Sequence, residues 1–293
     1  VLTLLLGTLV GIARLSSNWL VRRAAGAYVE ALRNVPPLLV IIFVNSAALA
    51  TLPPIDDPTR VGGALLLSVR EIGVIVPRGD GLGGLYVALL AGASVAAVAV
   101  GRWRASLEDR TGHPAHRWLW AGGLVAVVAV AGWFVLDAPV VLSRPEVVGR
   151  SIEGGVVMGL PFVAVLVGLV LYTATHVAEI VRGSILAVPK GQTEAATAVG
   201  LTTGQRLRYV VLPQAFRVAV PPIINQCLNL TKNTSLGVAV AYAEAMYVTR
   251  AAIGNGSPAI QSILVVMGMY LVVSLAISLV ANLANRRLRL VER

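Results

Sequence analysis

The chain alternates long apolar runs with short segments rich in arginine, glycine and proline. A run of about 20 apolar residues is long enough to cross the hydrocarbon core of a bilayer as a helix. We predict about seven membrane segments, the first of them truncated, at residues 1–13, 38–52, 85–100, 118–136, 156–181, 216–236 and 259–283. The predicted fold class is therefore all-α, a polytopic transmembrane helical bundle forming a single transmembrane domain over residues 1–293.

Shorter features complete this pattern. Residues 18–34 predict an amphipathic helix that lies near the membrane interface and ends before Pro36. Gly7 and Gly11 are spaced as a helix-packing notch, and Cys227 is expected to be a small packing residue. Residues 53–83, which have no charge bias, and residues 137–153 are expected to be outer loops.

Composition places the chain in a membrane. Of its 293 residues, 57% are hydrophobic and 13% are charged, and its mean hydropathy is +0.80. A soluble domain carries about 25% charged residues, so this chain has too little polar surface to dissolve. The single cysteine excludes an internal disulfide framework and any multi-cysteine metal site.

The formal net charge of +10 raises the possibility of a nucleic-acid partner. The excess arginine instead lies in short loops beside apolar segments, and arginine plus lysine is roughly three times as frequent in the proposed inner segments as in the outer ones. We therefore expect no nucleic-acid partner. The bias predicts that residues 189–213 and the C-terminus face the cytoplasm, with the lipid bilayer as the environment of the rest.

Residues 189–213 form a polar segment between two apolar ones, and they predict two short helices joined by a sharp bend. Residues 192–199 are good helix formers, and Gly200 follows at the position where a helix C-terminal stop is expected. Thr202 precedes Gln205 by three residues, which is the spacing of a capping box.

Glu194, Ala195 and Ala196, then Gly200, then nine residues to Val210, Leu212 and Pro213, resemble the EAA signature of ABC importer permeases. The flanking stretches AEIVRGSI, LPQAFRVAVPP, NLTKNTSL and NRRLRLVER are similar to polar amino acid permeases, and most of all to the larger permease subunits of general L-amino acid uptake systems. The resemblance covers residues 7–49 and 118–293 well. It implies a type I importer permease in a bacterial inner membrane, with residues 85–136 as an inserted helix pair.

The resemblance also implies partners. It makes residues 189–213 a coupling loop that docks on a dimer of ATP-binding subunits, through Gly191, Glu194, Ala195, Ala196, Gly200, Leu212 and Pro213. It further implies a second homologous permease, in a heterodimer, and a periplasmic or lipid-anchored amino-acid-binding protein. Neither lysine of the chain follows a glycine, so a Walker A loop is excluded, and we expect ATP and magnesium to bind the partner ATPase, with no cofactor and no catalytic residue in this chain.

The segment 216–236 is expected to be a broken span, interrupted at Pro221 and Pro222. Its second half carries more hydrogen-bonding side chains than lipid tolerates, so most are expected to face a pathway or another subunit. Opposite them, polar residues of the preceding span share one helix face. The candidate substrate-binding residues, with Lys232 as the partner of the substrate carboxylate, are Tyr172, Thr175, Asn225, Asn229, Lys232, Asn233, Thr234 and Ser235.

Two questions stay open at the level of sequence. Glu179 either faces a cavity or pairs with Arg182 at the cytoplasmic end of its helix. The leading function is a permease subunit that forms the pathway of an ATP-driven amino acid importer by alternating access. An ion-gradient-driven secondary transporter, with Glu179, His176 and Glu244 as relay groups, is the main alternative, and a membrane scaffold without transport activity is the third. Many polar amino acid permeases read KDTSL where this chain reads KNTSL, which argues against a cationic substrate.

Overall fold

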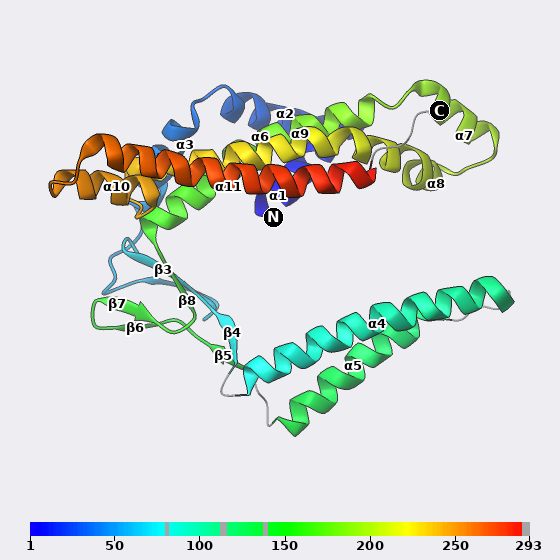
Figure 1. Ribbon diagram of the computed structural model, residues 1–293, viewed down its shortest axis with the longest axis horizontal. Helices are drawn as coiled ribbons and strands as arrows, with labels where there is room; N and C mark the ends of the chain where they lie inside the picture. Colours follow the sequence, from blue (N-terminus) through cyan, green and yellow to red (C-terminus); the bar gives the residue numbers. More distant parts are fainter. Residues whose placement is uncertain (80–81, 112–115, 137–139, 289–293) are drawn as a thin grey trace. The chain divides into compact units, whose positions relative to one another are not determined.

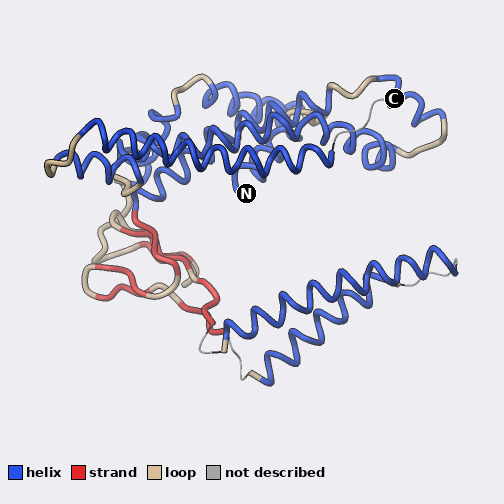
Figure 2. Tube along the Cα trace, viewed as in Figure 1, coloured by secondary structure: helices blue, strands red, loops and turns tan. Residues whose placement is uncertain are grey.

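The computed structural model describes residues 1–79, 82–111, 116–136 and 140–288. By contacts, the chain divides into one unit made of Val1–Leu52 with the segment from Gly159 onward, and a second unit made of Pro53–Met158. The first unit is helical, and the second combines short strands with two long helices (Figures 1 and 2). Whether residues 1–293 act as one transmembrane domain stays a prediction.

The first unit is built around helix α6 (Leu160–Leu186), which packs against α1, α2, α3 and α9. More than half of the apolar stretch of α6 is buried. The other elements of this unit are α1 (Leu2–Ala13), α2 (Trp19–Arg33), α3 (Pro37–Phe43), η1 (Val44–Leu49), α7 (Lys190–Ala198), α8 (Thr203–Arg206), η2 (Leu207–Val211), α9 (Leu212–Asn233), η3 (Thr234–Val240), α10 (Ala245–Gly254) and α11 (Ala259–Leu288).

Helix α1 approaches α6 closely at the predicted glycine notch. A Cβ added at Gly7 would lie 2.5 Å from the Val177 Cβ, and one added at Gly11 would lie 2.8 Å from the Ala178 carbonyl oxygen. Neither position therefore accepts a side chain unless the helices move apart. The sequence prediction of a helix-packing notch at Gly7 and Gly11 is confirmed.

A second close contact joins α3 to α6. A Cβ at Gly168 would lie 3.0 Å from the Ile41 Cα, and Ile41 is fully buried in a cluster with residues of α6 and η3. Nearby, the Tyr28 hydroxyl of α2 donates a hydrogen bond of 2.7 Å to the Leu171 carbonyl. Helix α6 is thus held on several sides by contacts that depend on small residues or on a satisfied hydroxyl.

Four helices of the described chain are long and apolar enough to span a membrane: Gly83–Glu108, Arg117–Val135, Leu160–Leu186 and Ala259–Leu283. The number rises to six if each of two bent helix pairs counts as one span, and the shorter α1 is apolar as well. The predicted helix at 18–34 is confirmed as α2, capped by the Asn18 side chain, and it meets the next helical segment at 104°. The predicted span at 156–181 starts later, at Leu160, because residues 156–159 form a strand.

Helix α9 is not interrupted at Pro221 and Pro222, so that prediction is wrong. Neither proline has a backbone N–H, and the carbonyls of Arg217 and Val218 consequently lack their usual helical donors four residues later. The helix nevertheless continues to Asn233 and then tightens into the 3₁₀ segment η3. Cys227 is exposed and not a packing residue, because α9 buries only Ala215 and Ala219.

The second unit contains strands where the sequence predicted outer loops. A four-stranded sheet has the order β1–β2–β3–β8, and β4–β5 and β6–β7 form two-stranded sheets. The β1–β2 hairpin pairs Val61 with Leu65 across Gly62, Gly63 and Ala64, and both glycines have positive φ. The strands are β1 (Thr59–Val61), β2 (Leu65–Leu67), β3 (Glu71–Val74), β4 (Val76–Gly79), β5 (Val140–Ser143), β6 (Glu146–Val148), β7 (Ser151–Glu153) and β8 (Val156–Gly159).

Side chains also fix this sheet region. The Glu71 carboxylate accepts hydrogen bonds from the Ser151 hydroxyl at 3.0 Å and the Ile152 backbone N–H at 2.8 Å. Ile152 packs in a small core with Ile55 and Leu66. Two long helices, α4 (Gly83–Thr111) and α5 (Arg117–Val135), occupy the region predicted to be an inserted helix pair, and β4 pairs antiparallel with β5. That the pair is an insertion stays a prediction.

We predict that Gly7→Ala destabilises the protein by about 1–3 kcal/mol, because the new methyl group meets the Val177 side chain and the Ala174 carbonyl oxygen. Thermal unfolding of the purified protein in detergent measures this loss. Gly26→Ala in α2 is the matched control, since a Cβ at Gly26 meets no heavy atom within 4 Å. Equal melting temperatures for the Gly7 variant and the control would contradict the packing role of the notch.

Candidate functional site

The predicted bend between residues 189 and 213 is confirmed in detail. Helix α7 ends at Ala198, and Gly200 has a φ of +80°, a conformation that glycine adopts without strain. The Leu201 N–H donates to the Ala196 carbonyl at 3.1 Å and the Gly200 N–H to the Thr197 carbonyl at 3.0 Å, which is the Schellman pattern. These bonds turn the chain sharply and satisfy the end of α7.

The second helix of this elbow begins with the predicted capping box. The Gln205 N–H donates to the Thr202 hydroxyl, and the Gln205 side-chain oxygen accepts from the Thr202 N–H at 2.9 Å. A π-helical turn, η2, follows and leads directly into α9, which has Pro213 at its second position. The Gln214 amide donates to the Gln192 side-chain oxygen at 3.2 Å and so links α9 back to α7.

The elbow presents an exposed surface with one acidic group. Glu194, Ala195, Gly191 and Gly200 are exposed, whereas Ala196 is buried beneath them. Glu194 and Arg206 line the same open pocket of about 390 Å³, and Arg206 donates to the Thr197 hydroxyl at 2.9 Å. The elbow also exposes large apolar side chains, which is the composition expected of a docking surface: Val199, Leu207, Tyr209 and Leu212.

A polar cavity of about 290 Å³ lies between α6 and α9. The structure brings four of the predicted substrate residues together in its lining, Tyr172 from α6 with Asn229, Lys232 and Asn233 from α9. The Tyr172 and His176 rings stack edge to face, with their centroids 4.9 Å apart. A lysine and several amides can bind a carboxylate, and the Tyr172 hydroxyl and the amide oxygens can accept from an ammonium group.

The other four predicted substrate residues do not line this cavity. Thr175 is fully buried and donates to the Tyr172 carbonyl of its own helix at 2.7 Å. Thr234 and Ser235 donate to the carbonyls of Thr231 and Lys232, at 2.7 and 2.8 Å. Asn225 is exposed. Serine and threonine hydroxyls in helices often donate to a carbonyl of the preceding turn, which is why such a side chain need not point at a ligand.

The cavity is completed by residues that the sequence analysis did not select for substrate binding, although it named His176 as a possible relay group. They are Pro37, Thr173, His176 and Gln226. The Thr173 hydroxyl is buried without a hydrogen-bond partner among the described residues. A buried hydroxyl without a partner is costly unless a ligand or water satisfies it. Gln226 lies three residues before Asn229, and that helical spacing was the available signal.

Glu179 does not face this cavity. It forms ion pairs with Arg182 at 2.6 Å, one turn along α6, and with Arg14, which follows α1. The side chains are 30% exposed for Glu179 and 17% exposed for Arg14. The structure thus favours the pairing interpretation over the relay interpretation, and it adds Arg14, a partner that the sequence analysis did not identify.

The chain matches the family model described as the binding-protein-dependent transport system inner membrane component over residues 3–290. It belongs to this family. Among curated relatives, the general L-amino acid transport system permease protein AapQ of Rhizobium johnstonii is 37% identical over 290 residues, with 99% of this chain and 72% of the relative aligned. The putative amino-acid ABC transporter permease protein YhdX of Escherichia coli is 36% identical, with 98% of this chain and 74% of the relative aligned.

A third relative and one solved structure complete the comparison. The glutamate/glutamine/aspartate/asparagine transport system permease protein BztB of Rhodobacter capsulatus is 34% identical over 319 residues, covering 96% of this chain and 73% of the relative. A crystal structure of an amino acid ABC transporter with histidines has a TM-score of 0.56, at 17% identity, covering 98% of this chain and 85% of that one. At that identity the likeness establishes the fold.

The fold class is thus confirmed as the helical fold of importer permeases, and this chain also contains short strands. As a member of this family of binding-protein-dependent permeases, the chain is a membrane-spanning transport component of the inner membrane, and no enzymatic activity is indicated. This membership supports the permease function over an ion-gradient-driven transporter.

We predict that Arg14 and Glu179 stabilise the protein through each other. In a double-mutant cycle with Arg14→Gln and Glu179→Gln, we expect a coupling free energy of about 0.5–3 kcal/mol, since the two side chains are in contact and mostly shielded from water. Thermal unfolding of the four proteins gives this value. Arg250→Gln combined with Glu179→Gln should be additive, and equal coupling in both cycles would refute a specific pair.

Proposed function

We propose that this chain is a permease subunit of an amino acid importer, that it works by alternating access, and that the elbow at 189–213 couples it to a separate ATPase dimer. The family match over residues 3–290 carries this proposal, together with relatives whose names specify amino acid transport. ATP and magnesium bind the partner subunits. The chain itself supplies the pathway and the coupling surface.

The elbow has features suited to receiving force. The hydrogen bonds around Gly200 stabilise the bend, and the Gln192–Gln214 hydrogen bond links α7 to α9. A displacement of α7 is therefore transmitted to α9. Glu194 is exposed at the tip beside a pocket that also contains Arg206. Ala196 packs beneath this docking surface. The residues that we assign to forming or supporting the surface are Gly191, Glu194, Ala195, Gly200, Leu212 and Pro213.

The substrate is held by the cavity between α6 and α9. Lys232 binds the carboxylate, the amides of Asn229, Asn233 and Gln226 bind polar groups, and the Thr173 hydroxyl gains a partner when the cavity is filled. Asn225 and Lys232 are exposed along α9, and a second permease subunit in a heterodimer would cover them. Thr175, Thr234 and Ser235 support the backbone around the site instead of touching the substrate.

The cytoplasmic orientation of the elbow and of the C-terminus is part of the proposal, supported by the distribution of arginine and lysine. In the proposed cycle, ATP binding closes the ATPase dimer and pushes the elbow, which opens the cavity outward. A periplasmic or lipid-anchored binding protein then delivers the amino acid, and hydrolysis returns the bundle to the inward-facing state. Uptake into vesicles that contain ATP but have collapsed ion gradients separates this cycle from secondary transport.

We expect Lys232→Ala to reduce amino acid uptake strongly while assembly persists. A hydrogen bond to a charged group contributes about 1.5–3 kcal/mol, so the apparent affinity should fall by roughly 10- to 150-fold. Uptake of a radiolabelled amino acid by proteoliposomes containing the complete transporter measures the effect. Ser235→Ala is the matched control, because that hydroxyl bonds only its own helix among the described residues. Unchanged uptake by the Lys232 variant would reject the assignment.

Glu194→Arg should detach the ATPase subunits. Reversing the charge at the exposed tip places a cation where the partner is expected to accommodate a carboxylate, and like-charge contacts at an interface cost several kcal/mol. Co-purification of the ATPase subunit should therefore fall by more than about tenfold, and ATP-driven uptake should fall with it. Glu146→Arg, an exposed reversal on a strand of the second unit, is the control. Full attachment and uptake in the Glu194 variant would overturn the coupling role.

A further inference from the structure

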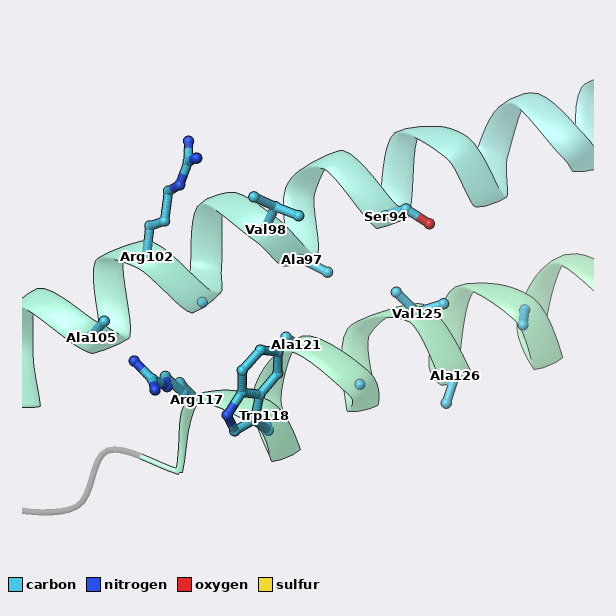
Figure 3. A pocket seen from close by; sticks show the side chains of 13 residues that line it. Ser94, Ala97, Val98, Arg102, Ala105, Arg117, Trp118, Ala121, Val125 and Ala126 are labelled. Atoms are coloured by element: carbon cyan, nitrogen blue, oxygen red, sulfur yellow. The ribbon is translucent and has the colours of Figure 1, made fainter. Parts of the chain in front are cut away.

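The helix pair α4 and α5 encloses an apolar groove that the transport cycle does not use. Its volume is about 770 Å³, and both helices contribute small residues to it, including Ala97, Gly101, Ala121 and Gly122. Figure 3 shows Ala97 and Ala121 in the lining. Ser94 is the hydroxyl among its described lining residues, and that hydroxyl already donates to the Leu90 carbonyl at 2.7 Å. The interior of the groove therefore suits an apolar chain and offers a polar molecule little to bind.

Aromatic contacts join the two helices at both ends of this groove. At one end, the Tyr86 and Trp133 rings meet edge to face at 6.2 Å, and the Tyr86 hydroxyl donates to the Ala129 carbonyl at 2.9 Å. At the other end, the Arg104 guanidinium lies 4.4 Å from the centre of the Trp120 ring. The groove thus lies between two specific contacts of the helix pair.

Two arginines lie at one end of the groove lining, Arg102 on α4 and Arg117 on α5. Figure 3 shows Arg117 in the first turn of α5, reaching toward α4 near Ala105, and Arg102 extending outward from α4. Trp118 beside them is 77% exposed. Exposed tryptophan with arginine is typical of the membrane interface, where lipid headgroups lie.

The dimensions agree with one lipid leaflet. From Ser94 to Ala105 the α4 helix rises by about 16 Å at 1.5 Å per residue, close to half of a hydrocarbon core of about 30 Å. An acyl chain that starts at the arginine end would therefore reach the other end of the groove near the bilayer centre. The two cations complement an anionic headgroup and not a neutral one.

We infer that the α4–α5 groove binds one anionic phospholipid, with an acyl chain between the helices and the phosphate on Arg102 and Arg117. Basic pockets between membrane helices on the cytoplasmic side are suited to such headgroups, and the arginine-rich segment after α4 is the one that we predict to lie inside. A bound lipid would cover small side chains that the two helices leave uncovered. The inference concerns a lipid site separate from the amino acid cavity, so it can fail while the transport function stands.

Native mass spectrometry of the full chain, incubated with equimolar phosphatidylglycerol and phosphatidylcholine, tests this site. We expect the wild type to retain phosphatidylglycerol in preference. Each arginine near the membrane surface contributes about fivefold to the binding of an anionic lipid. The double variant Arg102→Gln with Arg117→Gln should therefore reduce the preference for phosphatidylglycerol by up to about 30-fold. Arg110→Gln with Arg150→Gln removes the same charge outside the groove lining and should preserve the preference. Equal retention of both lipids by the wild type would overturn the proposal, as would equal loss in the two double variants.

Filling the groove provides a second test that does not depend on charge. Gly122→Leu should reduce retention of phosphatidylglycerol by at least severalfold, and a Cβ at Gly122 meets no heavy atom within 4 Å, so the helix pair should fold normally. Gly268→Leu in α11, where a Cβ also meets nothing within 4 Å, is the matched control. If Gly122→Leu keeps phosphatidylglycerol bound but prevents co-purification of a second permease subunit, the groove is a protein interface and the lipid proposal is wrong.

Discussion

Close packing of small residues against α6 is the constraint on which the transport unit depends. In a bilayer, apolar side chains gain little by leaving lipid for another helix, so association relies on close fit and on satisfied polar groups. Gly7 and Gly11 let α1 pack closely against Val177 and Ala178 of α6. Gly168 of α6 lets α3 pack closely at a second place. With α6 held in this way, Tyr172, Thr173 and His176 can line a cavity without rearrangement of the helix.

The second organising feature is the continuity between the elbow and the cavity. Helical structure runs without a break from Thr203 through η2 into α9 and reaches Lys232. The coupling surface near Glu194 is joined to this run by the bend at Gly200 and by the Gln192–Gln214 hydrogen bond. The continuous helical run from Thr203 to Asn233 thus connects the coupling surface to the cavity and supplies half of the cavity lining.

Local signals in the sequence were sufficient for much of this structure. The capping box at Thr202 and the stop at Gly200 depend on residues only a few positions apart, and both are present. The amphipathic helix 18–34 is likewise set by its own periodicity. The strands were missed because each has only three or four residues, although the adjacent glycines 62 and 63 are a recognised hairpin signal.

The cavity was only half predictable, for a physical reason. Thr173 and Thr175 are two residues apart on one helix, and only the packing around α6 decides that Thr173 lines the cavity while Thr175 bonds its own backbone. Similarly, Glu179 paired with Arg14 across 165 positions of sequence, a partner that no local pattern indicates. Helix boundaries follow from neighbouring residues, whereas the identity of a lining residue depends on contacts made by distant segments.

The adjacent prolines of α9 give that helix a soft point. A turn that lacks two consecutive backbone hydrogen bonds resists bending less than the turns on either side of it. Pro221 and Pro222 lie between the residues that enter the helix from the elbow and those that line the cavity. The cavity end of α9 can consequently tilt, by bending of the helix at Pro221 and Pro222, while the elbow end keeps its own orientation.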